Sequence, residues 1–135
     1  MKTGTFIYCD GSESDEFNPE KKLKGIAVVE DDNHVFLVLP NDVKNVDWWD
    51  GKRKSEEQFA QMPNLRQLEA IYKNKEVLNK AFIEAGGEAL DDGAYYWSST
   101  EYSSNNAWRL DMSDGFRLAN AKNVDSRYVR PVLAF

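Results

Sequence analysis

The C-terminal stretch, residues 95–135, constrains the fold most, because large aromatic anchors alternate there with small polar residues that have no helical period. The anchors are Tyr96-Trp97, Ala107-Trp108, Gly115 and the apolar segment 129–135. Large flat side chains can replace regular structure in a loop-rich fold, because each of them buries a large area. We therefore expect Trp97 and Trp108 to be buried, with variable surface between the anchors. This pattern is typical of a display scaffold rather than of an active site.

Within this stretch, residues 109–113 alternate polar and apolar side chains, which predicts a strand with one buried face. Gly115 lets the chain turn, and residues 117–126 then have little apolar content, so they predict an exposed connection or a ragged edge strand. Phe116 and Leu118 are apolar residues in a polar setting, which favours exposed binding positions. The alternative is that both enter the core as ordinary strand residues.

The first part of the chain predicts strands. Residues 3–10 are an apolar, β-rich run, and residues 25–29 and 35–39 are two further strands joined by a tight polar connection, which indicates a hairpin. Pro131 restricts the last strand to an edge or a bulge position.

The middle of the chain predicts two helices. Asn64 followed by Gln67 is a capping-box arrangement, and apolar residues then recur at helical spacing. A second helix over residues 76–85 ends at Gly86-Gly87. A third, short helix could start after Ser55, whose side chain could cap it. We expect an α+β fold in one domain: a twisted, mainly antiparallel sheet with two helices and a loop-rich C-terminal region.

Composition narrows the functional classes. The net charge is −6, and residues 109–135 hold five basic against three acidic residues, so the rest of the chain is strongly acidic. Binding to nucleic acid needs a basic face, so we expect no nucleic-acid partner. No apolar run reaches the length of a membrane span, so we expect no membrane insertion. The first residues lack the apolar region of a secretion signal, which leaves the location of the protein open.

Enzymatic motifs are missing. There is no Cys/His pair, nucleophile elbow, Gly-rich phosphate loop or His cluster, so we predict no catalytic residue, cofactor or metal ligand. Cys9, the single cysteine, permits no internal disulfide, and we expect it to be a small buried residue on the first strand rather than a reactive thiol. His34, the single histidine, is expected in a turn rather than in a catalytic role.

Two further features leave alternatives open. Trp48-Trp49 could stack on a sugar ring, although such a pair more often plugs a loop against the core. Asp91-Asp92, Asp111 and Asp114 could contribute to a calcium site, although ordinary solvated carboxylates are favoured.

Several motifs together resemble one group of proteins. They are YWSSTE (residues 96–101), NNAW (residues 105–108), a Gly seven residues after that Trp, and the closing RYVRPVLAF (residues 127–135). Residues 62–68, MPNLRQL, resemble the group's usual Leu-Pro-Thr helix start with Met and Asn substituted. The chain is similar, best over residues 62–135, to the variable proteins of diversity-generating retroelements, which use a C-type lectin fold.

The resemblance implies a C-type lectin-like fold in which residues 5–8 pair with residues 132–135, and a variable region over about residues 95–128. It implies a ligand-binding protein, displayed on a phage particle or a bacterial surface, whose C-terminal surface recognises a protein or another cell-surface molecule. The residues expected to be exposed, close together and in contact with the ligand are Arg109, Asp111, Ser113, Phe116, Arg117, Leu118, Asn120, Asn123 and Asp125.

Two other functions stay open. One is a lectin-like module without diversification that binds a fixed glycan through Trp48-Trp49. The other, less favoured, is an enzyme similar to the formylglycine-generating enzymes, whose chemistry uses a pair of cysteines that this chain lacks.

The residue types of the variable region fit the resemblance. In these retroelements template adenines are copied as any base, and Asn codons that end in a pyrimidine can become many residues but never Lys, Met, Trp, Glu or Gln. Between Arg109 and Val129 only Met112 and Lys122 fall outside the accessible set. We therefore expect Met112 and Lys122 to belong to the fixed framework.

Overall fold

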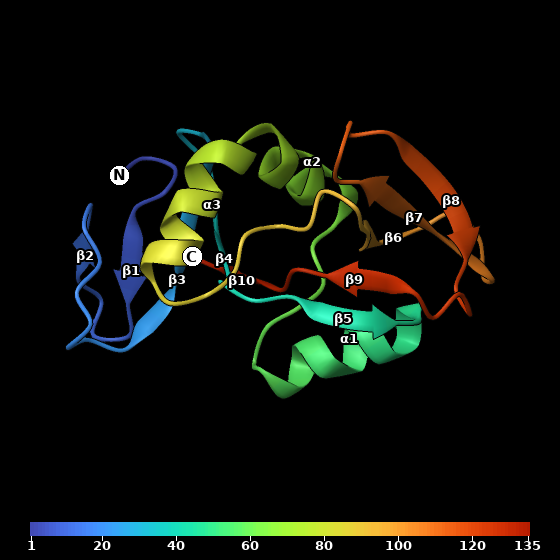
Figure 1. Cartoon of the computed structure of the whole chain (residues 1–135), viewed down its shortest axis with the longest axis horizontal. Helices are drawn as coiled ribbons and strands as arrows, with labels where there is room; N and C mark the ends of the chain where they lie inside the picture. Colours follow the sequence, from blue (N-terminus) through green and yellow to red (C-terminus); the bar gives the residue numbers. More distant parts are fainter.

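The chain folds into two five-stranded sheets and three helices, an α+β architecture, in a computed structural model that describes residues 1–135 (Figure 1). The elements are, in chain order, β1 (Phe6–Tyr8), β2 (Glu13–Ser14), β3 (Leu23–Asp31), β4 (His34–Val38), β5 (Val43–Val46), α1 (Trp48–Glu57), α2 (Leu65–Lys73), α3 (Lys75–Glu84), β6 (Tyr95–Glu101), β7 (Asn106–Asp111), β8 (Arg117–Ala121), β9 (Arg127–Val129) and β10 (Val132–Ala134). The α+β class is as the sequence predicts. A second sheet is present in addition, and the third helix that the sequence allowed is α1, with an earlier start.

The first sheet has the strand order β10-β4-β3-β1-β2 and is antiparallel throughout. The expected hairpin is confirmed as β3–β4, with exposed His34 at its turn. The expected pairing of residues 5–8 with residues 132–135 is wrong. β10 pairs with β4 instead, because the long β3–β4 hairpin lies between the two terminal strands. Pro131 comes directly before β10, an edge strand, where its missing N–H leaves no ladder bond unmade.

The second sheet has the order β5-β9-β6-β7-β8 and carries the C-terminal region. β6, β7 and β8 form an antiparallel meander in which Trp97 lies opposite Arg109, and Arg109 opposite Leu118. Because directly opposite residues project from the same side of a sheet, these three side chains share one face.

The helices follow local sequence signals. The capping box that the sequence predicts is present at α2: Asn64 accepts from the Gln67 backbone, and the Gln67 side chain accepts from Asn64 N. α1 begins earlier than expected, because Asp47 and not Ser55 caps it. Ser55 lies inside α1, buried, and donates to Gly51 O.

Two hydrophobic cores lie on the two sides of the second sheet. The larger one joins the first sheet, α2 and α3 to Tyr96 and Leu110. The smaller one packs α1, through Trp48, against Trp97 and Val129. Figure 1 shows α2 and α1 on opposite sides of this sheet.

Some residues expected in the interior lie elsewhere. Trp97 is fully buried as expected, but Trp108 is only half-buried. Trp108 projects from the opposite side of β7 to Arg109 and packs edge-on against exposed Tyr102, with 5.5 Å between ring centroids. Cys9, expected to be buried, is exposed just after β1 ends.

Arg130 links the two sheets from a fully buried position between β9 and β10. Its Nε donates to Asp42 Oδ1 at 2.7 Å, and its Nη2 donates to the carbonyls of Glu88 and Ala89. Tyr96 also donates to Asp42. Burial raises the pKa of Asp42 even beside this guanidinium. None of the three helices combines the length and apolar character that crossing a membrane requires.

Candidate ligand-binding surface

One face of the second sheet gathers most of the predicted ligand-binding residues. α1 covers this face over β5, β9 and β6, whereas the part over β8 is open to solvent. We call this open part the arginine face, and it consists of Tyr95, Arg109, Asp111, Phe116, Leu118, Asn120 and Arg127.

The centre of the arginine face is a pair of arginines on one tyrosine. The guanidinium carbons of Arg109 and Arg127 lie 4.0 and 4.6 Å from the ring centroid of Tyr95. Asn120 Oδ1 accepts from both, from Arg109 Nε at 3.0 Å and from Arg127 Nη2 at 3.1 Å. The prediction that Arg109 is largely exposed is therefore wrong: 8% of it is accessible, because the stacked ring and the Asn120 bond hold it against the sheet.

The guanidinium groups of Arg109 and Arg127 each keep a hydrogen-bond donor without an acceptor. Arg109 Nη1 and Arg127 Nε are buried and have no hydrogen-bond partner. Burial and the neighbouring charge of Arg109 lower the pKa of the Arg127 guanidinium. The cluster is a partly desolvated pair of cations that shares one neutral acceptor.

The turn after β7 fixes the outer end of the face. Asp111 is half-exposed, and its Oδ1 accepts from Ser113 N at 2.9 Å and from Ser113 Oγ at 2.6 Å. These bonds lower the pKa of Asp111. Ser113 is exposed as predicted but lies in the turn beyond the end of β7, so its expected place on the strand is wrong.

The turn returns through Gly115, as the sequence predicts. Its φ is +78°, in the left-handed region, and a Cβ there would meet Tyr72 Cε2 at 2.6 Å. Gly115 therefore lets the turn lie directly against α2.

Phe116, Arg117 and Leu118 do not form one patch as expected. Phe116 and Leu118 are 60% and 44% exposed, as predicted, on the side of Asp111 and Arg109. Arg117 is exposed too but projects from the other side of β8, where its Nη1 binds Glu69 of α2 at 2.9 Å. Successive strand residues point to opposite faces, which separates Arg117 from its two neighbours.

Asn123 and Asp125 are exposed as predicted, in the connection from β8 to β9. Between them Val124 packs inward on the smaller core. The expectation that all nine residues lie near one another is wrong. This connection and the 112–116 turn leave opposite ends of β8, whose five residues extend about 17 Å (Figure 1).

Met112 and Lys122 are buried, with 0% and 3% exposed surface. Lys122 Nζ donates to Glu101 and to Ser104 O, both at 3.0 Å, and lies 4.3 Å from the Trp48 ring centroid. Both side chains are structural supports of the surface rather than parts of it.

The Trp48-Trp49 pair is divided between interior and surface. Trp48 is buried and donates from Nε1 to Ser98 O, so it plugs α1 against the sheet. Trp49 is half-exposed, at right angles to Trp48. A cleft of about 170 Å³ beside Trp48 is lined by Trp48, Lys52, Glu56, Gln61, Met62, Ser99 and Glu101.

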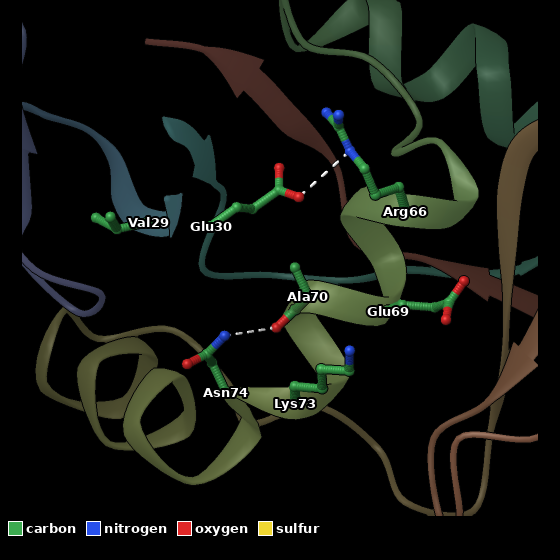
Figure 2. Close-up of a pocket in the computed structure, with 7 residues that line it drawn as sticks. All are labelled: Val29, Glu30, Arg66, Glu69, Ala70, Lys73 and Asn74. Atoms are coloured by element: carbon green, nitrogen blue, oxygen red, sulfur yellow. Dashed lines mark hydrogen bonds and ion pairs between the residues drawn. The ribbon is translucent and has the colours of Figure 1, made fainter. Parts of the chain in front are cut away.

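A larger hollow of about 480 Å³ separates β3 from α2 (Figure 2). Glu30 reaches across it to Arg66 Nε at 3.3 Å, and Lys73 extends beside it. Glu69 points away from the hollow, toward Arg117 of β8. Both acidic and basic side chains line this hollow, so it does not select for a ligand of one charge. The ion pair across it is weak, because the Arg66 side chain is exposed to solvent.

The candidate calcium carboxylates are engaged separately. Asp91 accepts from Gly93 N, Asp92 pairs with Lys75, and Asp114 accepts from Phe116 N. No three His, Cys, Asp or Glu side chains are grouped as a metal site would require.

Sequence reasoning missed Tyr95 and Arg127 as members of the surface. Tyr95 begins β6 and Arg127 begins β9, so neither is close in sequence to Arg109 or Asn120. Only the strand order β9-β6-β7-β8 brings them together. No periodic pattern in the sequence indicates this strand order.

Comparison with known proteins shows a likeness of fold. No family of known proteins matches the sequence, and no curated protein matches it at a significant level. Among solved structures, a fimbrial protein from Bacteroides ovatus ATCC 8483 is similar over the whole of this chain, with a TM-score of 0.60 and 12% sequence identity. The chain corresponds to 49% of the length of that protein, and at this identity the likeness concerns the fold alone.

Proposed function

We propose that this protein binds a protein or another cell-surface ligand through the arginine face, and that it is a variable protein of the diversity-generating retroelement type with a C-type lectin-like fold. One observation carries the proposal. Met112 and Lys122, the two residues that adenine-directed change could not produce, are both buried, while Phe116 and Leu118 between them are exposed apolar residues. A fixed frame with a replaceable surface requires this division.

Energetics supports a replaceable surface. Exposed positions tolerate most substitutions within about 0.5 kcal/mol, whereas loss of a buried anchor such as Trp97 costs several times more. Phe116 and Leu118, beside two arginines and a tyrosine, have the composition that protein-binding hot spots favour.

The C-type lectin-like fold is supported by the sequence motifs, whereas the terminal strands β1 and β10 share one sheet without pairing directly. Display on a phage particle or a bacterial surface is part of the proposal.

Glycan binding at a fixed site is a second candidate, favoured by the half-exposed indole of Trp49, next in the chain to Trp48, which lines the cleft. Of the two tryptophans only Trp49 could offer an aromatic face to a sugar ring, because the indole of Trp48 is buried. This candidate places the ligand on α1 rather than on β8.

Binding assays on arrays of bacterial surface proteins and of glycans test both candidates. For each ligand found, Phe116→Ala/Leu118→Ala is compared with Arg117→Ala, a matched change on the other side of β8, and with Trp49→Ala. The proposal expects loss of binding in the first variant alone, with an unfolding temperature close to that of the unmodified protein. Loss in Trp49→Ala alone would replace the proposal with the fixed-glycan function.

A further inference from the structure

The six arginines of this chain divide into two groups. Four of them form ion pairs with carboxylates: Arg53, Arg66, Arg117 and Arg130. Arg109 and Arg127 form none, and they are the two that lie together on Tyr95. The unpaired positive charge of the arginines is therefore concentrated at one place on the arginine face.

The site also leaves strong donors unused. A guanidinium offers five N–H donors and no acceptor. Of the three nitrogens of Arg109 only Nε donates, and its single acceptor, Asn120 Oδ1, is shared with Arg127. Arg127 donates otherwise only to Ser126 Oγ at 3.3 Å. Arg109 Nη1 and Arg127 Nε are unpaired but closed to solvent. The donor left for a ligand is Arg109 Nη2, which bonds to no group of the protein and is not among these buried atoms.

No carboxylate of the protein accepts a hydrogen bond from Arg109 or Arg127. Asp111 is the acidic residue of the arginine face, and Ser113 holds its Oδ1 through two hydrogen bonds. Asp111 acts on Arg109 through space without forming an ion pair. Burial and, after it, the charge of Arg109 lower the pKa of Arg127, so the two neighbouring cations disfavour each other.

We propose that Arg109 and Arg127 form a receptor for a carboxylate, supplied by an Asp or Glu side chain of a protein ligand. The planar fork of a guanidinium matches the two oxygens of a carboxylate. Tyr95 and Asn120 hold both forks in place before the ligand arrives, which reduces the entropy lost on binding.

A protein source is favoured over an acidic sugar by what surrounds the two arginines. Leu118 lies directly opposite Arg109 on the neighbouring strand, and Phe116 continues the same face toward the turn. Both are exposed apolar side chains, which would pack on an apolar part of a protein ligand. The inference rests on the proposed function, since it specifies the chemistry of the same surface.

The test uses the whole chain and a defined probe, the α-methylamide of N-acetylglutamate, with the matching glutamine compound as neutral control. NMR follows the side-chain Nε–H signals of the arginines during titration. We expect saturable shifts at Arg109 and Arg127 with the glutamate probe, no shift at Arg53 or Arg117, and none with the glutamine probe. Arg127→Gln should weaken binding at least about tenfold, the factor expected for one hydrogen bond to a charged group. Arg117→Gln should leave it unchanged.

Three results would overturn the inference: no shift at Arg109 or Arg127 with the glutamate probe, equal shifts with the glutamine probe, or tighter binding of glucuronate, which would identify an acidic sugar instead. Thermal unfolding of Arg127→Gln and Arg127→Lys separates loss of the receptor from loss of the fold. If the carboxylate receptor is disproved, ligand binding through Phe116 and Leu118 can still hold. The proposed function is tested separately, by the Phe116→Ala/Leu118→Ala variant.

Discussion

At the scale of single residues, two buried arginines, Arg130 and Arg109, differ in the hydrogen-bond acceptors that surround them. Arg130 is enclosed by acceptors on every side: Asp42, and the carbonyls of Leu39, Glu88 and Ala89. Arg109, almost as deeply buried, has one neutral acceptor. A buried charge that is fully paired supports the fold, and one that is not is a candidate for function.

Arg130→Met should cost on the order of 3–5 kcal/mol of unfolding free energy, because it leaves the Asp42 carboxylate buried without its partner. Chemical denaturation measures this loss. Arg117→Met is the control, an exposed pair with Glu69 that should cost about 1 kcal/mol or less. Adding Asp42→Asn to Arg130→Met should recover part of the loss. Equal costs for the two single variants would mean that Arg130 does not connect the sheets.

The sequence indicates residue roles where a local pattern determines them. The left-handed turn at Gly115 and the exposure of Phe116 and Leu118 follow from residue type and setting. The burial of Arg109 could not be predicted, because it depends on Tyr95 and Arg127 arriving from two other strands. The predicted full burial of Trp108 is wrong for a similar reason. On its side of β7, α2 does not cover the strand as far as Trp108.

At the scale of elements, the 112–116 turn is held between the arginine face and α2. Gly115 lies against Tyr72 of α2, and Arg117 binds Glu69 one turn earlier on the same helix. The packing of α2 therefore fixes where β8 begins and, with it, where Phe116 and Leu118 project.

Gly115→Ala should destabilise the protein by about 2–4 kcal/mol, since the left-handed conformation costs about 1–2 kcal/mol with a side chain and the contact with Tyr72 adds to this. Gly86→Ala is the matched control. Gly86 has a φ of +82° and no atom within 4 Å of an added Cβ, so only the conformational cost applies. Thermal or chemical unfolding of both variants gives the difference. Equal losses would show that the turn does not rest on α2.

Helices and hairpins were the most predictable elements. The capping box at Asn64 and the left-handed Gly86 at the end of α3 are local signals, and both are present. The start of α1 was missed because Asp47 caps a segment that begins with two tryptophans, a composition that suggests a loop. The pairing of β10 with β4 was missed because strand order is a long-range property.

At the scale of the whole molecule, the second sheet has two different sides. One side joins α2, α3 and the first sheet in the larger core, and the other is closed by α1 over only part of its width. The open remainder over β8 is the arginine face, bordered by buried Trp97 on the same side of the sheet and by buried Met112 on the other, with buried Lys122 directly after β8. Substitutions on that face leave both cores untouched, which is the physical basis for a replaceable surface on a fixed frame.

Sequencing of the segment that encodes residues 95–128 in many clones of one population, together with the adjoining DNA, tests this division most directly. We predict a near-copy of the segment beside a reverse transcriptase gene. Substitutions should fall at template adenines and at exposed positions such as Phe116, Leu118 and Asn123, while Trp97, Met112 and Lys122 stay constant. A sequence that is identical in all clones and has no near-copy, or substitutions as frequent at buried codons as at exposed ones, would contradict the account.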